Sequence, residues 1–234
     1  LAITYKDINE IDKAIESYKK AIEINPKFAA AYNNLGNIFK ESGRKHSAIA
    51  YYEKAIEINP KFAEAFNNLG NIFKDLDQFD NAIVSYKKVI ELNKNFQDSY
   101  YNLGLTYKEQ RKLNDAVTSF NNAISLKSDF SEAYNELGVC YTLLGQMLDA
   151  ISCFEAAIKL KKDYAVAYNN LGKALIIKGK AKAGLDFIQK AIAIDPEFSH
   201  AYANLGHAFK RLKERDQALS AYEQAWTIEP EMNY

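Results

Sequence analysis

Cysteine, histidine and any excess of charge are scarce in this chain, and each shortage argues against a class of function. The two cysteines among 234 residues, Cys140 and Cys153, are too few for a disulfide framework, so we expect reduced, buried or half-buried thiols in a cytoplasmic protein. The three histidines, His46, His200 and His207, do not stand at metal-ligand spacing with either cysteine, so no metal site is predicted. With 30 basic and 30 acidic residues the net charge is zero, which removes the electrostatic argument for nucleic acid or an anionic membrane as partner.

Long hydrophobic runs and glycine-rich loops are also missing. No apolar run approaches the roughly 20 residues that a membrane-spanning helix needs. The ten glycines are spread along the chain, so none of them forms a loop that would cradle a phosphate. We therefore predict no cofactor and no enzyme chemistry within this chain.

What the chain does have is an internal repeat. An aromatic residue, Leu-Gly and a second aromatic residue recur every 34 residues, first at Tyr32 to Phe39 and then at Phe66 to Phe73. A small residue and a bulky one follow at a constant offset, as in Ala48 and Tyr52. Apolar residues recur at three- and four-residue steps in both halves of each unit, which predicts two amphipathic helices. No unit can bury its apolar faces alone, so neighbouring units must stack.

This pattern resembles the tetratricopeptide repeat family over the whole chain. The resemblance implies an all-α fold, a right-handed superhelical solenoid of about seven helix-turn-helix repeats. We expect one array over residues 1–234, with a truncated first repeat. The expected repeats cover residues 1–28, 29–62, 63–96, 97–130, 131–164, 165–198 and 199–232.

Both ends of the array look uncovered. Leu1 occupies the leucine of the Leu-Gly signature, and the chain stops shortly after Pro230, where a further unit or a capping helix would begin. Trp226 lies near that uncovered end, so we expect a segment of a longer protein. Self-association through the two ends is one functional alternative.

The first helix of each unit has a face that packing does not require. Counting Tyr32 as the fourth position of its unit, the second, sixth, ninth and thirteenth positions lie opposite the packed face. In the tetratricopeptide family this face lines the groove that holds extended peptides. The residues that we predict to bind peptide are therefore polar groups of the sixth and ninth positions. They are Asn34, Asn37, Asn68, Asn71, Asn102, Asn170, Lys173, Asn204 and His207.

The sixth position forms a ladder of asparagines that is interrupted at Glu136. An asparagine amide offers an acceptor and two donors, which match the C=O and N–H groups of an extended peptide backbone. The alternative is that asparagine is simply common before Leu-Gly in this family and was copied when the repeats duplicated. Chaperone-binding members of the family hold a carboxylate with cations at the second, fifth and sixth positions. No cation stands at the second or fifth position here, so that mode is disfavoured.

The asparagines before Leu-Gly, with an aromatic residue after the turn as at Phe28 and Phe62, look like a particular subgroup. They resemble the tetratricopeptide region of O-linked N-acetylglucosamine transferases, in which an asparagine ladder binds substrate polypeptide. The resemblance implies a substrate-recognition segment whose catalytic domain lies outside this chain.

Apolar residues interrupt the polar face in the fifth and sixth units. Earlier units carry Lys-acid pairs at the twelfth and thirteenth positions, as at Lys40 and Glu41, which predicts a solvated rim. We predict instead a hydrophobic contact site for a partner at Val139, Leu143, Val166, Ile176 and Ile177. The alternative is that these side chains only thicken the packing, since the sixth unit is irregular at Gly184 and Ile188.

Three functions follow from these observations. The first is a protein interaction scaffold that binds extended peptides through the asparagine ladder. The second is the substrate-recognition segment of a glycosyltransferase, and the third is a self-assembling structural solenoid.

Overall fold

A computed structural model describes residues 10–231, and the regular structure of these residues is entirely α-helical. The predicted features at Leu1, in the rest of residues 1–9 and in residues 232–234 lie outside the described part. The helices are α2 (Ile11–Ile24), α3 (Ala29–Glu41), α4 (Lys45–Ile58), α5 (Ala63–Lys74), α6 (Phe79–Leu92), α7 (Gln97–Glu109), α8 (Leu113–Leu126), α9 (Ser131–Leu143), α10 (Met147–Leu160), α11 (Ala165–Ile177), α12 (Ala181–Ile194), α13 (Ser199–Leu212) and α14 (Arg215–Ile228).

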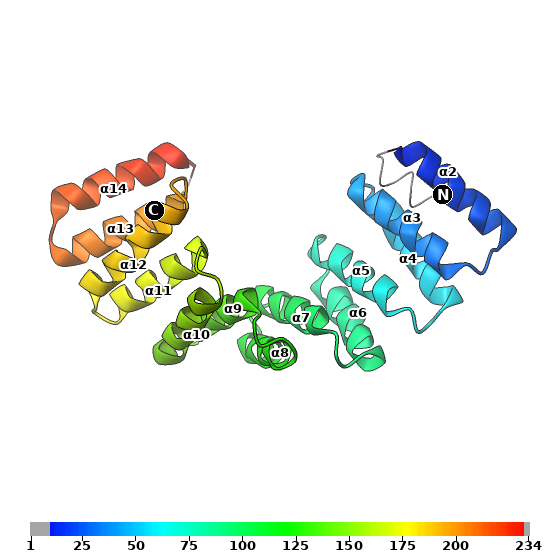
Figure 1. The fold of residues 1–234 in the computed structure, drawn as a ribbon, viewed down its shortest axis with the longest axis horizontal. Helices are drawn as coiled ribbons and strands as arrows, with labels where there is room; N and C mark the ends of the chain where they lie inside the picture. Colours follow the sequence, from blue (N-terminus) through cyan, green and yellow to red (C-terminus); the bar gives the residue numbers. More distant parts are fainter. Residues whose placement is uncertain (1–9, 232–234) are drawn as a thin grey trace. The chain divides into compact units, whose positions relative to one another are not determined.

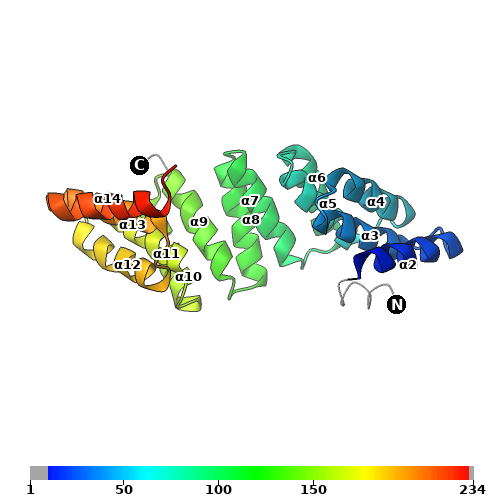
Figure 2. The same ribbon diagram turned by 90° about the horizontal axis from the view of Figure 1, so that it is seen from above.

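The helices fall into two compact units, which meet in the sequence between Arg111 and Lys112. Unit 1 contains α2 to α7, and unit 2 contains α8 to α14 (Figures 1 and 2). Within each unit, successive helices form hairpins, such as α3 with α4 and α11 with α12, and successive hairpins pack on one another. The predicted all-α helical-repeat fold is confirmed.

Each hairpin contributes its two helices to different layers of its unit. In unit 2 the first helices of the hairpins touch one another in the order α9, α11 and α13, whereas α10, α12 and α14 make no such contacts among their described residues. Unit 1 repeats this arrangement, because α3, α5 and α7 touch in turn while α4 and α6 do not. The first helices are therefore closer together and form the inner layer of each unit.

The chain reverses between helices through two kinds of turn. After α2, α4, α6 and α12, an asparagine or aspartate side chain accepts a backbone N–H two residues ahead, as Asn25 Oδ1 does from Lys27 (3.1 Å), which forms an Asx turn. Between the helices of one hairpin, a residue adopts left-handed backbone geometry, as Gly43 does at φ 75°. Non-glycine residues occupy the equivalent point at Asp77, Arg111 and Lys213, whose φ values are 56°, 59° and 66°.

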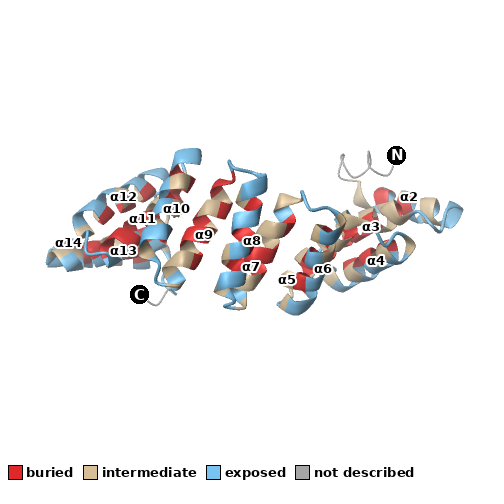
Figure 3. Cartoon of the chain, turned by 90° about the horizontal axis from the view of Figure 1, so that it is seen from below, coloured by how far each residue is buried: buried red, intermediate tan, exposed pale blue. Residues whose placement is uncertain are grey.

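The core of each hairpin lies between its two helices, where small residues admit bulky ones (Figure 3). Ala48 and Tyr52 on α4 are fully buried. The Tyr52 ring lies so close to α3 that a Cβ on Gly36 would stand 2.5 Å from its Cε1 atom. Such a contact is far inside van der Waals distance, so this glycine is required for the approach of the helices.

The irregular residues of the sixth unit bring α11 and α12 together still more closely. A Cβ on Gly184 would lie 2.6 Å from the carbonyl oxygen of Gly172, so the backbones themselves are in contact there. Ile176 packs in the same cluster as Ile188 and is only 7% exposed. The prediction that Ile176 belongs to an exposed contact surface is therefore wrong. Gly184 has no side chain, so the backbone of α12 packs directly against Ile176 and buries it.

Candidate functional site

The asparagine ladder lies on the inner helices of the two units and is half-buried throughout. Unit 1 carries its part on α3, α5 and α7, and unit 2 carries its part on α11 and α13. Glu136 stands in the gap of the ladder on α9 and is half-buried as well. The ladder residues are Asn34, Asn68, Asn102, Asn170 and Asn204.

The ladder amides bind the preceding repeat, which the sequence did not reveal. Asn170 Nδ2 donates to Asn135 Oδ1 at 2.9 Å, and Asn204 Nδ2 donates to Asn169 Oδ1 at 2.9 Å. Both acceptors belong to the fifth position and are nearly inaccessible, with exposed fractions of 1% and 5%. These bonds satisfy buried carbonyl groups and tie consecutive hairpins together.

Unit 1 contains the same network with an additional acceptor. Asn68 Nδ2 lies 3.2 Å from Asn33 Oδ1 and 3.1 Å from Asn37 Oδ1, so it bridges two residues of α3, the first helix of the preceding repeat. Asn102 Nδ2 donates to Asn71 Oδ1 at 3.3 Å. The predicted peptide-binding residues Asn37 and Asn71 therefore use their carbonyl oxygens inside the fold.

The residue at the ninth position contacts the bulky residue of the second helix in the same hairpin. The hydroxyl of Tyr52 donates to Asn37 Oδ1 at 2.7 Å, and the hydroxyl of Tyr86 donates to Asn71 Oδ1 at 2.7 Å. Burial raises the pKa of the Tyr52 phenol, with smaller contributions from nearby carboxylates, so the hydroxyl remains a donor at neutral pH.

Where the second helix carries phenylalanine in place of this tyrosine, as at Phe120 and Phe154, the ninth position is apolar, whereas Lys173 is paired with Ile188. Val139 stands beside Phe154 in the lining of one pocket. In the last hairpin His207 packs edge-on against the Tyr222 ring, with the ring centroids 5.5 Å apart. The pairing of the ninth position with the bulky residue 15 positions later could have been found from the sequence, because the two residues change together between repeats. Comparing one position of the repeat at a time did not reveal it.

The ladder retains hydrogen-bonding capacity after these internal bonds are counted. An amide has two N–H donors and one carbonyl acceptor. In Asn170 and Asn204 one donor serves the neighbouring repeat, which leaves the second donor and the carbonyl oxygen. Both groups belong to half-exposed side chains on the inner layer of unit 2. This capacity matches one N–H and one C=O group of an extended peptide.

The predicted hydrophobic residues divide between surface and core. Leu143, Val166 and Ile177 have exposed fractions of 47%, 40% and 53%, which are large for apolar side chains. Val139 is half-buried and packs against the core of its hairpin. With Ile176 inside the core, the exposed part of the predicted patch consists of three side chains.

Two pockets lie along the inner layer of unit 2. The smaller, of about 120 Å³, is lined by residues of α9 and α11 together with Phe154 of α10, and it includes Leu143, Asn170 and Lys173. The larger, of about 560 Å³, lies between α11 and α13 and contains four further predicted residues, Ile176, Ile177, Asn204 and His207, besides Lys173. The structure thus brings most of the predicted site residues of unit 2 together, whereas Val166 lines neither pocket.

The same surface holds two residues that the sequence analysis did not select. Lys210 and Arg211 line the larger pocket from the last turn of α13. Arg211 occupies the thirteenth position, where Glu41 and Asp75 stand in earlier repeats. This change of sign was visible in the sequence once the thirteenth positions were compared.

The thiols and histidines show no arrangement that suggests catalysis. Cys140 is buried and Cys153 is half-buried, and both are free cysteines. Burial raises the pKa of the Cys153 thiol to about 11, with a smaller contribution from Asp149, so the thiol stays protonated and weakly nucleophilic. Within residues 10–231 no His, Cys, Asp and Glu side chains gather in a group that could hold a metal ion. The helices of this part include none with the length and apolar character needed to cross a membrane.

Comparison with known families gives a consistent result along the chain. A TPR repeat model matches residues 4–43 and 70–111, and three tetratricopeptide repeat models match the intervening and following segments. The first of these three models matches residues 29–62 and 131–164, the second matches 51–84, and the third matches 97–130, 165–198 and 199–232. The chain belongs to the tetratricopeptide repeat family.

Solved tetratricopeptide structures resemble this chain over most of its length. The crystal structure of YrrB, described as a TPR protein with an unusual peptide-binding site, is 27% identical, with a TM-score of 0.69. The match covers 80% of this chain and 96% of YrrB. The crystal structure of MamA is 31% identical, with a TM-score of 0.63, over 69% of this chain and 95% of MamA.

A curated relative shares a shorter segment. Photosystem I assembly protein Ycf3 of Prochlorococcus marinus subsp. pastoris is 43% identical over 44 residues. This match covers 19% of the tetratricopeptide chain described here and 25% of Ycf3, so the chain spans about a quarter of the length of that relative.

Proposed function

We propose that this chain is a protein interaction scaffold that binds extended peptide segments of other proteins along its inner helices. The tetratricopeptide fold is consistent with a protein interaction scaffold, and the residual capacity of the ladder amides supports the finer proposal. Asn170 and Asn204 each retain a donor and an acceptor on a half-exposed face. Their spacing follows the repeat, so backbone recognition needs no particular side chain on the ligand.

The relative YrrB supports the same proposal by analogy, since its structure is described as containing a peptide-binding site. The pockets of unit 2 offer space beside the ladder for side chains of the ligand. Leu143 and Ile177 would add apolar contacts there, as exposed aliphatic groups commonly do at interaction sites. A cytoplasmic location accompanies this proposal and stays a prediction.

Binding to an array of unstructured peptides tests the proposal. The double variant Asn170→Ala/Asn204→Ala removes two backbone-binding amides, each contributing about 0.5–1.5 kcal/mol as a hydrogen-bond partner. We therefore expect roughly 5- to 150-fold weaker binding of peptides that the parent protein captures. Asn121→Ala is the matched control, because Asn121 is exposed on α8 of the outer layer.

The fold must be monitored in the same variants, because Asn170 and Asn204 also bind the preceding repeats. Circular dichroism should show unchanged helicity, with a modest decrease in thermal stability. Unchanged peptide affinity in the folded double variant would contradict the ladder mechanism.

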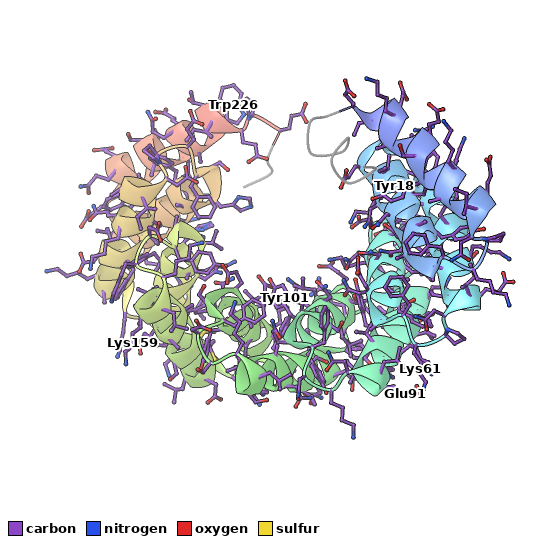
Figure 4. All side chains as sticks on the ribbon, turned by 45° about the vertical axis from the view of Figure 1, so that its right-hand side comes forward. Tyr18, Lys61, Glu91, Tyr101, Lys159 and Trp226 are labelled. Atoms are coloured by element: carbon purple, nitrogen blue, oxygen red, sulfur yellow. The ribbon has the colours of Figure 1, made fainter. Side chains whose placement is uncertain are left out.

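Two alternative functions follow from the sequence. None of the relatives named above carries the name of a glycosyltransferase, so the role of a transferase substrate arm rests on the ladder asparagines and on the aromatic residues after the turns, such as Phe28. Self-assembly would use the exposed Trp226 on α14, which is 59% exposed (Figure 4). Light scattering over a range of concentrations separates self-assembly from peptide binding, because only self-assembly increases the mass in the absence of ligand.

A further inference from the structure

Unit 2 carries a concentration of unneutralised positive charge in two adjoining pockets. The pocket between α11 and α13 adjoins a second pocket of about 600 Å³, since Ile176 and Arg211 line both. No acidic side chain lines either pocket among the described residues. The cations of the two linings are Lys173, Lys180, Lys182, Lys210 and Arg211.

The positive charge of the last repeat is not neutralised as it is in the first four repeats. There the twelfth and thirteenth positions pair a lysine with an acid, as in Lys40 with Glu41 and Lys74 with Asp75. In the last repeat the same positions hold Lys210 and Arg211, so the neutralising acid is replaced by a second cation. None of the five cations takes part in an ion pair in the part of the chain that the structure describes.

The charges converge on the larger pocket. His207, which lines it, has its pKa lowered first by burial and then by the positive charges of Lys210, Lys173 and Arg211. Those three cations lie close enough to one imidazole ring to disfavour a further positive charge there. An anionic group placed in the pocket would be attracted by all three.

The rest of the lining selects the kind of anion. Ile177 is 53% exposed at this pocket, and Ile176 contributes to its wall, so part of the surface is apolar. Among the described lining residues of the two adjoining pockets there is no Phe, Tyr or Trp on which a nucleic-acid base could stack. A volume of about 560 Å³ suits one or two side chains of a ligand.

We propose that the pocket between α11 and α13 binds a segment of a protein partner in which acidic and large apolar residues are interspersed. This inference rests on the proposed function and specifies the ligand of the same inner surface. The amide of Asn204 would hold the backbone, Ile177 would contact an apolar side chain, and Lys173, Lys210 and Arg211 would face the carboxylates. In an extended segment, alternate side chains point to the same side about 7 Å apart, so a carboxylate and an apolar side chain on that side can reach a cation and Ile177.

Calorimetric titration with short synthetic peptides tests this inference. One peptide repeats Asp-Asp-Leu-Leu, so that each side of an extended chain carries both residue types. A second peptide replaces the aspartates with lysine, and a third replaces the leucines with serine. We expect the first to bind at least about tenfold more tightly than either of the others, because each lacks one of the two interactions. Increasing salt should weaken the binding of the first peptide.

Charge reversal on the protein locates the binding site. We expect Lys173→Glu/Lys210→Glu to weaken binding of the acidic apolar peptide by about tenfold or more. Lys159→Glu/Lys162→Glu makes the same change in net charge at two exposed lysines outside the pockets, and Figure 4 shows Lys159 on α10. This control should change the affinity by less than about threefold, because separated surface charges are screened.

The possible failures are distinguishable. Equal binding of all three peptides, unaffected by Lys173→Glu/Lys210→Glu, would overturn the acidic preference and leave general peptide binding intact. Absence of binding for every peptide would overturn the proposed function as well. Tighter binding of a single-stranded oligonucleotide or of phosphatidylserine vesicles than of the acidic apolar peptide in the same titration would also overturn the assignment to a protein partner.

Discussion

The hydrogen bond between Asn37 and Tyr52 allows a quantitative test of whether the ninth position serves the fold. Tyr52 is fully buried, and its hydroxyl has Asn37 Oδ1 as acceptor at 2.7 Å. Asn37→Val leaves this buried hydroxyl without its acceptor, which costs about 1–3 kcal/mol. Tyr52→Phe removes only the donor, and Asn37 Oδ1 still accepts from Asn68, so we expect a smaller loss of about 0.5–1.5 kcal/mol.

Both changes together should be less destabilising than the sum of the two. The double variant Asn37→Val/Tyr52→Phe contains no orphaned hydroxyl, and it reproduces the natural pair Val139 and Phe154 of a later repeat. We expect a coupling energy of about 1 kcal/mol or more. Urea unfolding followed by circular dichroism measures it, provided that the m-values agree between variants.

Additivity of the two single changes to within about 0.5 kcal/mol would refute this reasoning. The pair Asn71 and Tyr86, which makes the same hydrogen bond at 2.7 Å, provides an internal repetition of the experiment. A coupling found at one pair and absent at the other would show that position nine is not a general structural device of these repeats.

Three further predictions concern stability and reactivity. Lys213 has a φ of 66°, so Lys213→Gly should stabilise the protein by up to about 1 kcal/mol, whereas Gly43→Ala should destabilise it by a similar amount. Thermal melts compare the two variants, and a lower melting temperature for Lys213→Gly would contradict the backbone argument. Gly36→Ala should cost about 1–3 kcal/mol in urea unfolding because its methyl group would meet the Tyr52 ring, so a neutral result contradicts the packing. Burial raises the pKa of Cys153 to about 11, so at pH 8 its thiol should react with iodoacetamide about a hundredfold more slowly than a thiol of pKa 9. Mass spectrometry should show the reaction rate rising up to about pH 11. A rate that stops rising near pH 9 would contradict the raised pKa.

The helical repeat could be predicted from the sequence because its causes are local. The spacing of apolar residues specifies two amphipathic helices per unit, and the small residue at Gly36 anticipates the approach of Tyr52. The resemblance to the tetratricopeptide family added the stacking of the units. Both inferences depend on features that every repeat shares.

The structural use of the asparagines could not be predicted in this way, because it depends on which side chains meet between repeats. Asn68 reaches Asn33 and Asn37, which lie 35 and 31 residues away. Periodicity places these residues on particular helices, but only the packing of the hairpins shows that their amides are within hydrogen-bond distance.

Departures from the repeat were harder still to interpret. Ile176 occupies a position that is lysine in earlier repeats, yet it is buried because Gly184 and Gly172 allow α12 to approach α11. The cations Lys210 and Arg211 acquire their significance only beside Lys173 of the neighbouring hairpin. In both cases the effect depends on unusual residues in two different helices that lie side by side. Comparing one position of the repeat at a time therefore does not reveal it.

The central claim, that peptides bind to the inner helices through the ladder amides, is tested most directly by nuclear magnetic resonance of the asparagine side chains. A peptide captured from an array of unstructured, Ser/Thr-containing sequences would be titrated into the labelled protein. The account predicts shifts of the Nδ2 resonances of Asn170 and Asn204 in unit 2 and none for the exposed Asn121 on α8. Saturable binding with both resonances unmoved, and with shifts confined to the outer helices or to Trp226, would contradict it.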